Sequence, residues 1–342
     1  MKSQPNILLI YTGGTIGMIK DFETGALKNF NFDELLQHIP ELQLLDCTIA
    51  TTSLKKPIDS SNMSPSHWVD LVQIIESRYD GYDGFVVLHG SDTMSYTASA
   101  VSFMLENLGK PVIFTGSQLP IGDLRTDAKE NLITSIQIAS LCEKGVPKIN
   151  EVGLYFEYKL YRANRTTKLN AEHFEAFASL NYPPLVESGV HLAVVEDALL
   201  IPNRRKKLKV HTSLEANVLL VKMFPGMTPD SIMHLFSYQD MQGLVLETYG
   251  SGNVTDAPWF IQALKSVIQR GIPVVNVTQC AGGSVSMGLY ETSIQLKKLG
   301  VISGKDVTTE AALAKMMYLL GQGISGATFK TFFETSLRGE MA

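Results

Sequence analysis

Short apolar runs alternate with amphipathic helical patterns along the first half of the chain. Each run is apolar at nearly every position and stops at a turn that contains glycine or polar residues. Strands that are apolar on both sides are typical of a parallel sheet that helices cover on both faces. The pattern therefore predicts strands at Ile7–Tyr11, Gly84–Leu88, Val112–Thr115 and Val152–Phe156.

Helices are expected between these strands. Ser64 is a helix cap that precedes Pro65 at the first helical position. Further helical patterns cover Met94–Leu108, which Gly109 ends, and Thr126–Leu141. Strands that alternate with helices in this way indicate an open α/β sheet. In the first of these helices, one face carries the apolar residues Trp68, Leu71, Val72 and Ile75.

The basic run Asn203–Lys209 marks a change in the chain, after which the strand–helix alternation restarts. It is interpreted as a solvated linker, because one short basic run in an acidic chain is weak evidence for an anion-binding surface. We predict a larger N-terminal α/β domain over 1–195, a linker over 196–214 and a smaller C-terminal α/β domain over 215–342. The second domain is expected to contain strands at Val218–Val221, Gly243–Thr248 and Pro273–Val277, and helices at Trp259–Arg270 and Thr309–Leu320.

The composition is that of a folded globular protein. Of 342 residues, 45% are hydrophobic and 18% charged, whereas disorder requires many charges and little to bury. The net charge of −5 argues against a nucleic-acid partner, which requires a basic face. No segment resembles a signal peptide or approaches the roughly 20 apolar residues of a membrane span, so a cytoplasmic protein with no membrane partner is expected. The distant cysteines Cys47, Cys142 and Cys280 predict neither disulfides nor a zinc site.

Polar side chains gather where the predicted strands end. Because ligands bind beyond the carboxyl ends of the strands in open α/β sheets, these turns predict a small polar pocket. Thr12–Thr15 does not fit the glycine patterns of dinucleotide or P-loop sites. Taken alone, Thr12–Thr15 is more consistent with a tight turn that binds nothing, and Ser91-Asp92 with an ordinary helix cap. The turns are Thr12–Thr15, Asp59–Ser61, His89–Thr93 and Thr115–Ser117.

A lysine follows the strand Val152–Phe156, at the end of the polar segment Arg162–Lys168. A threonine hydroxyl is too weak an acid to be a nucleophile without a base at neutral pH, and a lysine desolvated among hydroxyls can lose its proton and act as that base. A neighbouring aspartate would orient the lysine or hold an ammonium group of the substrate.

These residues carry a resemblance to a known family. The sequence resembles the bacterial-type L-asparaginases, specifically their cytoplasmic type I branch, from Tyr11 nearly to Glu340. The resemblance implies two α/β domains, with the active site at the carboxyl ends of the N-terminal strands. It rests on Tyr11–Gly17, Asp59–Ser61, 83–98, Gly109–Pro111, Gly116–Gln118, Asn164–Lys168 and Thr278–Cys280.

The resemblance implies hydrolysis of L-asparagine to L-aspartate and ammonia, with no metal and no cofactor. Thr15 corresponds to the nucleophile that forms an acyl-enzyme. Ser91, Asp92 and Lys168 correspond to a second catalytic cluster, in which Asp92 also binds the substrate's α-amino group.

Further positions correspond to substrate-binding groups. Ser60, with Asp59 and Ser61 beside it, occurs where the family binds the α-carboxylate. The backbone N–H groups of Ser91 and Ser117 occur where the family has its oxyanion hole. The family resemblance also implies a homodimer or homotetramer.

The sequence departs from the family pattern at two places near the site. Position 91 is Ser where the family has Thr, so the hydroxyl lacks the methyl group that restricts its rotamer. The expected lid, residues 21–29, lacks the tyrosine that often lies near the nucleophile. Lys168, acting through Ser91 or water, is therefore the preferred base.

A second, regulatory asparagine site is a weaker expectation. Thr167 and Cys280 match residues that some type I enzymes use there. Glu247, however, stands where that site has an arginine, and a carboxylate cannot pair with an effector carboxylate.

The sequence also allows other functions. One is an amidase with a different substrate, such as glutamine, D-asparagine or an amidated tRNA. Another is an amino-acid sensor that binds asparagine without hydrolysing it. His89, beside the expected site, is interpreted as a packed imidazole rather than a catalytic base.

Overall fold

The chain folds into two compact units, Met1–Thr212 and Ser213–Ala342. The computed structural model describes residues 4–20, 27–29, 39–203, 205–288 and 291–342. The division between the units falls within the segment 196–214, and each unit contains its own sheet.

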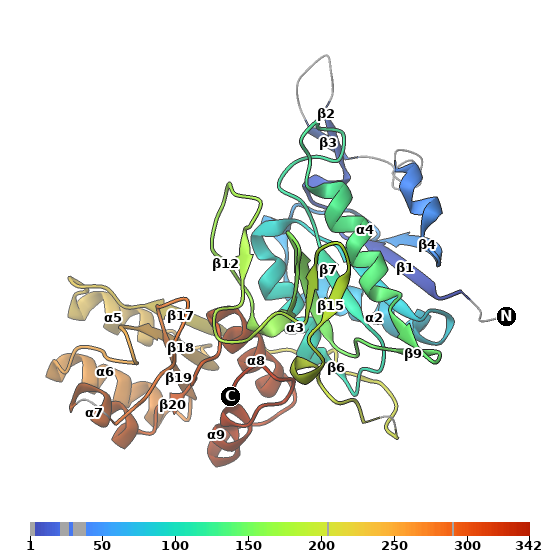
Figure 1. Cartoon of the computed structure of the whole chain (residues 1–342). Coiled ribbons are helices and arrows are strands. Elements are labelled where there is room, and N and C mark those ends of the chain that lie inside the picture. Colours follow the sequence, from blue (N-terminus) through green and yellow to red (C-terminus); the bar gives the residue numbers. More distant parts are fainter. Residues whose placement is uncertain (1–3, 21–26, 30–38, 204, 289–290) are drawn as a thin grey trace. The chain divides into compact units, whose positions relative to one another are not determined.

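The first unit is built on an eight-stranded sheet with the order β15-β14-β11-β10-β7-β5-β1-β4 (Figure 1). The strands from β10 to β4 are parallel to one another. The apolar runs predicted β1, β5, β7 and β10, but not β4, whose side chains are only partly buried. Their bounds are β1 Asn6–Tyr11, β4 Thr48–Ser53, β5 Gly84–Leu88, β7 Val112–Thr115 and β10 Val152–Phe156.

Alternate residues of the parallel strands face opposite layers of helices. Leu9 and Val86 belong to the apolar cluster that includes α4 (Ala128–Ala139). Phe85 faces the other side, where Tyr79, just after α2 (Pro65–Arg78), stacks on its ring with the ring centroids 6.0 Å apart. α3 (Met94–Met104) packs beside α2 and against β7 and β10. The central strands are therefore covered on both faces, as continuous apolar runs require.

Three antiparallel strands extend the sheet beyond β10, and the apolar runs did not predict them. β11 pairs with β10 on one side and with β14 on the other, and β15 completes the edge. These strands are β11 Lys159–Arg162, β14 Val186–Ser188 and β15 Leu192–Val194.

The predicted helices are confirmed, and two of them are shorter than expected. α4 covers Ala128–Ala139 rather than Thr126–Leu141. The cap at Ser64 and the buried face of α2 are as predicted. α3 ends at Met104 rather than at Leu108, because the next two residues form β6 (Leu105–Glu106), which pairs with β16 (Lys209–Val210). The end of the basic run is therefore attached to unit 1. Other two-stranded sheets are β2 Met18–Lys20 with β3 Leu27–Asn29, β8 Cys142–Glu143 with β9 Val146–Pro147, and β12 Thr167–Lys168 with β13 Phe177–Ala178.

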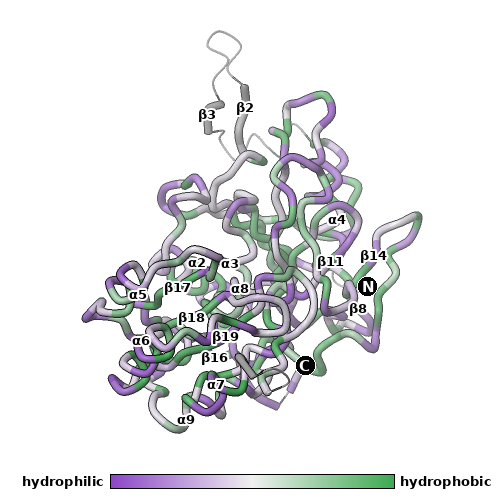
Figure 2. Tube along the Cα trace, turned by 90° about the vertical axis from the view of Figure 1, so that its left-hand side faces the viewer, coloured by the Kyte–Doolittle hydropathy of each residue, from purple (hydrophilic) through white to green (hydrophobic). Residues whose placement is uncertain are grey.

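The second unit is a four-stranded parallel sheet with the order β17-β18-β19-β20. Along α6, apolar and polar stretches alternate (Figure 2), and its apolar side, which includes Phe260 and Leu264, belongs to the core of this unit. The elements are β17 Val218–Lys222, α5 Pro229–Phe236, β18 Gly243–Thr248, α6 Pro258–Gln269, β19 Val274–Thr278, α7 Glu291–Leu299, β20 Ile302–Ser303, α8 Thr309–Gly321 and α9 Gly326–Glu334.

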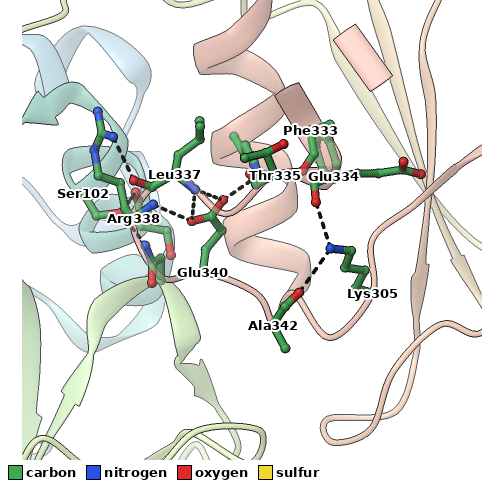
Figure 3. Close-up of polar contacts among 12 residues, drawn as sticks. Ser102, Lys305, Phe333, Glu334, Thr335, Leu337, Arg338, Glu340 and Ala342 are labelled. Atoms are coloured by element: carbon green, nitrogen blue, oxygen red, sulfur yellow. Dashed lines mark hydrogen bonds and ion pairs between the residues drawn. The ribbon is translucent and has the colours of Figure 1, made fainter. Parts of the chain in front are cut away.

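A buried ion pair fastens the last residues of this unit. Lys315 of α8 pairs with Glu340, and neither side chain is exposed to solvent. The Glu340 carboxylate also accepts from the N–H groups of Leu337 and Arg338, at 3.0 and 2.7 Å (Figure 3). Burial lowers the pKa of Lys315, although Glu340 acts in the opposite direction.

Candidate active site

The candidate active site lies at the carboxyl ends of four neighbouring strands of the first unit. β4, β1, β5 and β7 are adjacent in the sheet, and each is followed by one of the polar turns singled out in the sequence. The chain leaves β1 for β4 on one side and later enters β5 on the other, so the strand order reverses between β1 and β5. Ligands of open α/β sheets bind at such a reversal.

Glycines bring these turns into backbone contact. Gly14, at φ +93°, packs against Gly90 so closely that a Cβ would lie 2.5 Å from the Gly90 Cα. Gly13, at φ +129°, approaches Ile58 in the same way, with a Cβ 1.9 Å from the Ile58 carbonyl oxygen. A Cβ on Gly90 would lie 2.5 Å from the Ser60 hydroxyl oxygen. Because no side chain fits at these contacts, glycine holds the turns after β1, β4 and β5 together.

Thr15 begins the 3₁₀ turn η1 (Thr15–Gly17) and is half-buried. Tyr11 packs against this turn, and its hydroxyl donates to the Gly17 carbonyl at 3.3 Å. Burial raises the pKa of Tyr11 to about 12, so this phenol stays protonated and supports the turn from inside. Residues 21–26 of the expected lid lie outside the described residues.

Lys168 joins two of the predicted site residues. Its Nζ lies 2.8 Å from the Ser91 Oγ and 2.8 Å from a carboxylate oxygen of Asp92. Ser91 opens the turn η5 (Ser91–Thr93) after β5, whereas Lys168 ends β12. Lys168 is 17% exposed and Asp92 66% exposed, so the contact lies at the rim of the site. The structure thus brings Ser91, Asp92 and Lys168 together.

The segment before Lys168 is buried, rather than the polar surface loop that its composition suggests. Arg162 forms an ion pair with Glu151 in which both side chains are 4% exposed. It also donates to the Ala198 carbonyl at 2.8 Å, and its guanidinium lies 4.5 Å from the centroid of the Tyr182 ring. These contacts fix the chain that carries Lys168.

Gln118 is a member of the site that the sequence reasoning did not assign. Its side-chain oxygen accepts a hydrogen bond from the Ser91 hydroxyl at 3.3 Å. Its Nε2 donates to the carbonyls of Ala171 and His173 at 3.2 and 2.9 Å. Its backbone N–H donates to the buried carboxylate of Asp127 at 2.9 Å. Two signals could have pointed to it: its place after β7, next to Ser117, and its membership of the motif Gly116–Gln118.

The turn after β4 presents two hydroxyls and a carboxylate. Asp59 accepts from the Ser61 N–H at 2.9 Å and from the Ser61 hydroxyl at 2.8 Å, and these bonds hold the pKa of Asp59 below its ordinary value. Ser60 is buried, and its carbonyl accepts from the Thr93 hydroxyl at 2.8 Å. The turns after β4 and β5 are therefore linked by a side chain as well as by glycine.

The turn after β7 carries Ser117, and side chains at the start of α4 form hydrogen bonds to it. The buried Ser117 hydroxyl donates to the Leu119 carbonyl at 2.6 Å. Asn131 donates to the Gly116 carbonyl at 3.0 Å and to Asp127 at 3.2 Å. The first turns of α4 thus position this part of the site.

His89 is fully buried behind the turn after β5. Its Nδ1 lies 2.7 Å from the Gly90 carbonyl, and its ring packs against Phe114. Burial lowers the pKa of His89 to about 4. A neutral imidazole with no solvent exposure fits the packing role that the sequence suggested.

The residues expected at a regulatory site belong to different units. Thr167 is half-buried in the first unit, and Cys280 is exposed with a free thiol in the second. Glu247 accepts from the Thr309 hydroxyl at 2.6 Å and pairs with Lys222 at 3.3 Å. This carboxylate is therefore already satisfied within its own unit.

The described residues contain no cluster of histidine, cysteine and acidic side chains that could hold a metal ion. In the same part of the chain, no helix has the length and apolarity needed to cross a bilayer.

Fold and site together define a class: an α/β protein of two units, with hydroxyl, carboxylate and ammonium groups gathered where the strand order of a parallel sheet reverses. Family models agree with this division. Residues 6–199 match the model "Asparaginase, N-terminal", and residues 217–333 match the "Glutaminase/Asparaginase C-terminal domain". The chain belongs to the asparaginase family, as the sequence motifs predicted.

Individual relatives resemble the chain over its whole length. It is 43% identical to L-asparaginase 1 of Escherichia coli (strain K12), over 98% of each chain. It is 39% identical to a 60 kDa lysophospholipase of Mus musculus, over 100% of this chain and 63% of the mouse protein. The crystal structure of L-asparaginase I from Vibrio cholerae O1 biovar eltor str. N16961 superposes with a TM-score of 0.90 at 40% identity, over 99% of each chain. These matches confirm the predicted fold class.

Proposed function

We propose that this protein hydrolyses L-asparagine to L-aspartate and ammonia through an acyl-enzyme on Thr15. The Thr15 oxygen attacks the side-chain amide carbon, the C–N bond breaks, and ammonia leaves with the proton that the nucleophile gave up. Water then cleaves the ester, which releases aspartate and returns the proton to Thr15. Family membership supports the reaction, and the geometry at the strand ends supports the residue roles.

The observation that carries the proposal is the position of Lys168. Its ammonium group lies 2.8 Å from both the Ser91 hydroxyl oxygen and an oxygen of the Asp92 carboxylate. Ser91 and Asp92 follow Gly90, and Gly90 packs against Gly14 in the turn that carries Thr15. A hydroxyl, a carboxylate and an amine in contact can move a proton and bind an α-amino group. A turn with only a packing role would not require a lysine, a hydroxyl and a carboxylate in contact at the point where the strand order reverses.

Backbone donors support an oxyanion hole in the same place. Within the described part of the chain, the N–H groups of Ser91 and Ser117 have no hydrogen-bond acceptor. They belong to the turns after the adjacent strands β5 and β7. Two such donors can stabilise the negative oxygen that develops when Thr15 attacks the amide.

The turn Asp59–Ser61 supplies the groups proposed for the α-carboxylate. Its contact with Gly90 and the hydrogen bond from Thr93 support a location beside the catalytic turn. Asp92, with its side chain at the rim and paired with Lys168, is the proposed partner of the α-ammonium group.

Ammonia release over an asparagine concentration series tests the proposal, with glutamine and D-asparagine as competing substrates. Asparagine should be hydrolysed with the highest kcat/KM. A protein that binds asparagine by calorimetry but releases no ammonia would instead be a sensor, which contradicts the proposal.

Two variants test the residue roles. Thr15→Ala should lower kcat by at least about a thousandfold, because no nucleophile remains. Lys168→Met should lower it by about a hundredfold or more, because proton transfer is lost. Lys129→Met is the matched control, since the Lys129 side chain is 44% exposed and its ion pair with Glu41 is 3.7 Å long. Circular dichroism checks the fold, and near-normal turnover of either site variant would refute that residue's role.

Regulation by asparagine at a second site has weaker support. Thr167 and Cys280 are the residues that would contribute, but Glu247, engaged by Lys222 and Thr309, offers no cation to an effector carboxylate. A hyperbolic velocity curve without a lag would exclude cooperative regulation.

The proposal includes a cytoplasmic location and a homodimer or homotetramer. Light scattering of the purified protein tests the oligomeric state, and a mass equal to that of one chain would contradict it.

A further inference from the structure

We propose that Gln118 is a positioning residue that holds the Ser91 side chain in one rotamer with its O–H bond directed at Gln118, and thereby makes Ser91 a hydrogen-bond acceptor toward Lys168. The inference rests on the proposed function, because Ser91 matters only if its cluster takes part in the reaction.

The orientation of the Gln118 amide follows from its surroundings. One end of the amide lies 3.2 Å from the carbonyl oxygen of Ala171 and 2.9 Å from that of His173. A carbonyl oxygen can only accept, so this end must be the NH₂ group. The other end, which faces Ser91, is therefore the oxygen.

The orientation of the Ser91 hydroxyl follows in turn. An amide oxygen can only accept, so Ser91 donates its hydrogen to Gln118 at 3.3 Å. The Ser91 oxygen then presents its lone pairs elsewhere, and Lys168 donates to one of them at 2.8 Å. Lys168 also donates to Asp92. The carbonyls of Ala171 and His173 therefore fix the direction of every hydrogen bond in this cluster. Because the Ser91 hydrogen points to Gln118, Lys168 acts as base through water rather than through Ser91.

Gln118 is itself held rigidly. The carboxylate of Asp127 accepts from its backbone N–H with both oxygens, at 2.9 and 3.1 Å. Asp127 is buried and also accepts from Asn131, one turn further along α4. Backbone and side chain of Gln118 are thus fixed by separate sets of partners.

This role explains how serine can stand at position 91. A serine side chain can occupy three staggered rotamers, whereas the γ-methyl of threonine restricts that choice. At position 91 the hydrogen bond to Gln118 selects one rotamer in place of the missing methyl. One lone pair of Ser91 stays available for a donor in the site, such as the water that cleaves the acyl-enzyme.

The test is a double-mutant cycle between positions 91 and 118. Gln118→Leu, which has nearly the same shape and no polar atoms, should lower kcat for asparagine about tenfold, the worth of one hydrogen bond. In a Ser91→Thr background, the same change should lower kcat less than about threefold, because the threonine methyl restores the rotamer. Any change in KM through the contacts with Ala171 and His173 should be similar in both backgrounds. Gln73→Leu, on the exposed side of α2, is the matched control with unchanged activity.

An equal loss of kcat in both backgrounds, or no loss in either, would overturn the inference, because a merely structural role would not depend on residue 91. If Gln118→Leu fails to fold, Gln118→Met replaces it in the same cycle. Crystal structures give a readout without turnover: one Ser91 rotamer in the wild type, several in Gln118→Leu, and one again in the double variant. A wild type that releases no ammonia would refute the proposed function, while the rotamers would still decide the role of Gln118.

Discussion

At the scale of single residues, His89 shows how a buried polar group can support the site without chemistry. The Gly90 carbonyl can only accept, so the hydrogen of the neutral imidazole lies on Nδ1. Nε2 is buried and, among the described residues, has no partner. An unsatisfied acceptor costs stability, and the structure tolerates it where the imidazole fixes the peptide that precedes Ser91.

His89 predicts a specific dependence of stability on pH. Its pKa is about 4 in the folded protein and about 6.5 when unfolded, so between these values only the unfolded state takes up the proton. The free energy of unfolding should therefore fall as the pH drops from 6.5 to 4, by up to about 3 kcal/mol. Urea unfolding across this range measures it.

His89→Asn is the comparison, because the asparagine Nδ2 can replace the donor Nδ1 but does not titrate. Its unfolding free energy should be lower than that of the wild type at pH 7, owing to the lost volume, and should depend less steeply on pH between 4 and 6.5. Parallel pH curves for the two proteins would contradict the assignment.

At the scale of elements, the turn between β10 and β11 is strained. Glu157 and Tyr158 occupy left-handed backbone conformations, at φ +43° and +71°. This is the geometry of a two-residue hairpin turn, for which Asn-Gly is the favoured pair. Burial and the nearby carboxylates of Asp127, Glu130 and Glu175 also raise the pKa of Glu157 to about 7.

Replacing the pair by Glu157→Asn and Tyr158→Gly should stabilise the protein by about 1 kcal/mol. The gain should be larger at pH 8 than at pH 5. The raised pKa of Glu157 means that the stability linked to its protonation is present below about 4.5 and is lost as the pH rises through 7. Thermal unfolding at the two pH values measures both effects. Gly145→Ala is the control, because Gly145 lies at φ +79° in the β8–β9 turn and an alanine there should lower the stability of the protein.

The sequence predicts elements well where one local signal determines them. The parallel strands β1, β5, β7 and β10 follow from runs that are apolar on both sides, and α2 follows from its cap and its apolar face. The half-exposed β4 has no such run and was not predicted. β11 escapes prediction because its role depends on Val186–Ser188, far along the chain. The last turn of the predicted helix 94–108 is lost because Leu105–Glu106 pairs with Lys209–Val210 instead.

The same distinction holds for the site. Hydroxyls directly after apolar strands predict its location, since strand ends meet at one edge of a sheet. The part played by Gln118 could not be predicted, because it depends on the carbonyls of Ala171 and His173, more than fifty residues away. The buried ion pair between Arg162 and Glu151 could not be predicted either, because the polar composition of the segment around Arg162 suggests exposure to solvent.

At the scale of the whole molecule, each unit has its own apolar core. The second unit also buries a charged side chain, that of Lys315. Lys315 donates to the carbonyls of Phe333 and Thr335 at 2.6 and 2.7 Å in addition to its pairing with Glu340. The buried Lys315 ammonium group therefore binds three groups of the C-terminal segment 333–340, and these bonds make that segment part of the core.

Lys315→Met should lower the free energy of unfolding of the second unit by about 3–5 kcal/mol, because Glu340 would be left as an uncompensated buried charge. The double variant with Glu340→Leu should recover part of this loss. Lys222→Met, which removes an exposed partner of Glu247, should cost less than about 1 kcal/mol. Hydrogen exchange of the β17–β19 amides measures these changes, and unaltered exchange in Lys315→Met would contradict the prediction.

The glycine contacts between the strand ends have a consequence for the entropy of the reaction. Where Gly14 meets Gly90, and Gly13 meets Ile58, the two sides of the site touch through atoms that have no rotamers. The freedom to misalign the turn of Thr15 with the turn of Ser91 is therefore lost once, when the chain folds, and not again in each catalytic cycle. Substrate binding then has to order only the substrate and the few side chains around it.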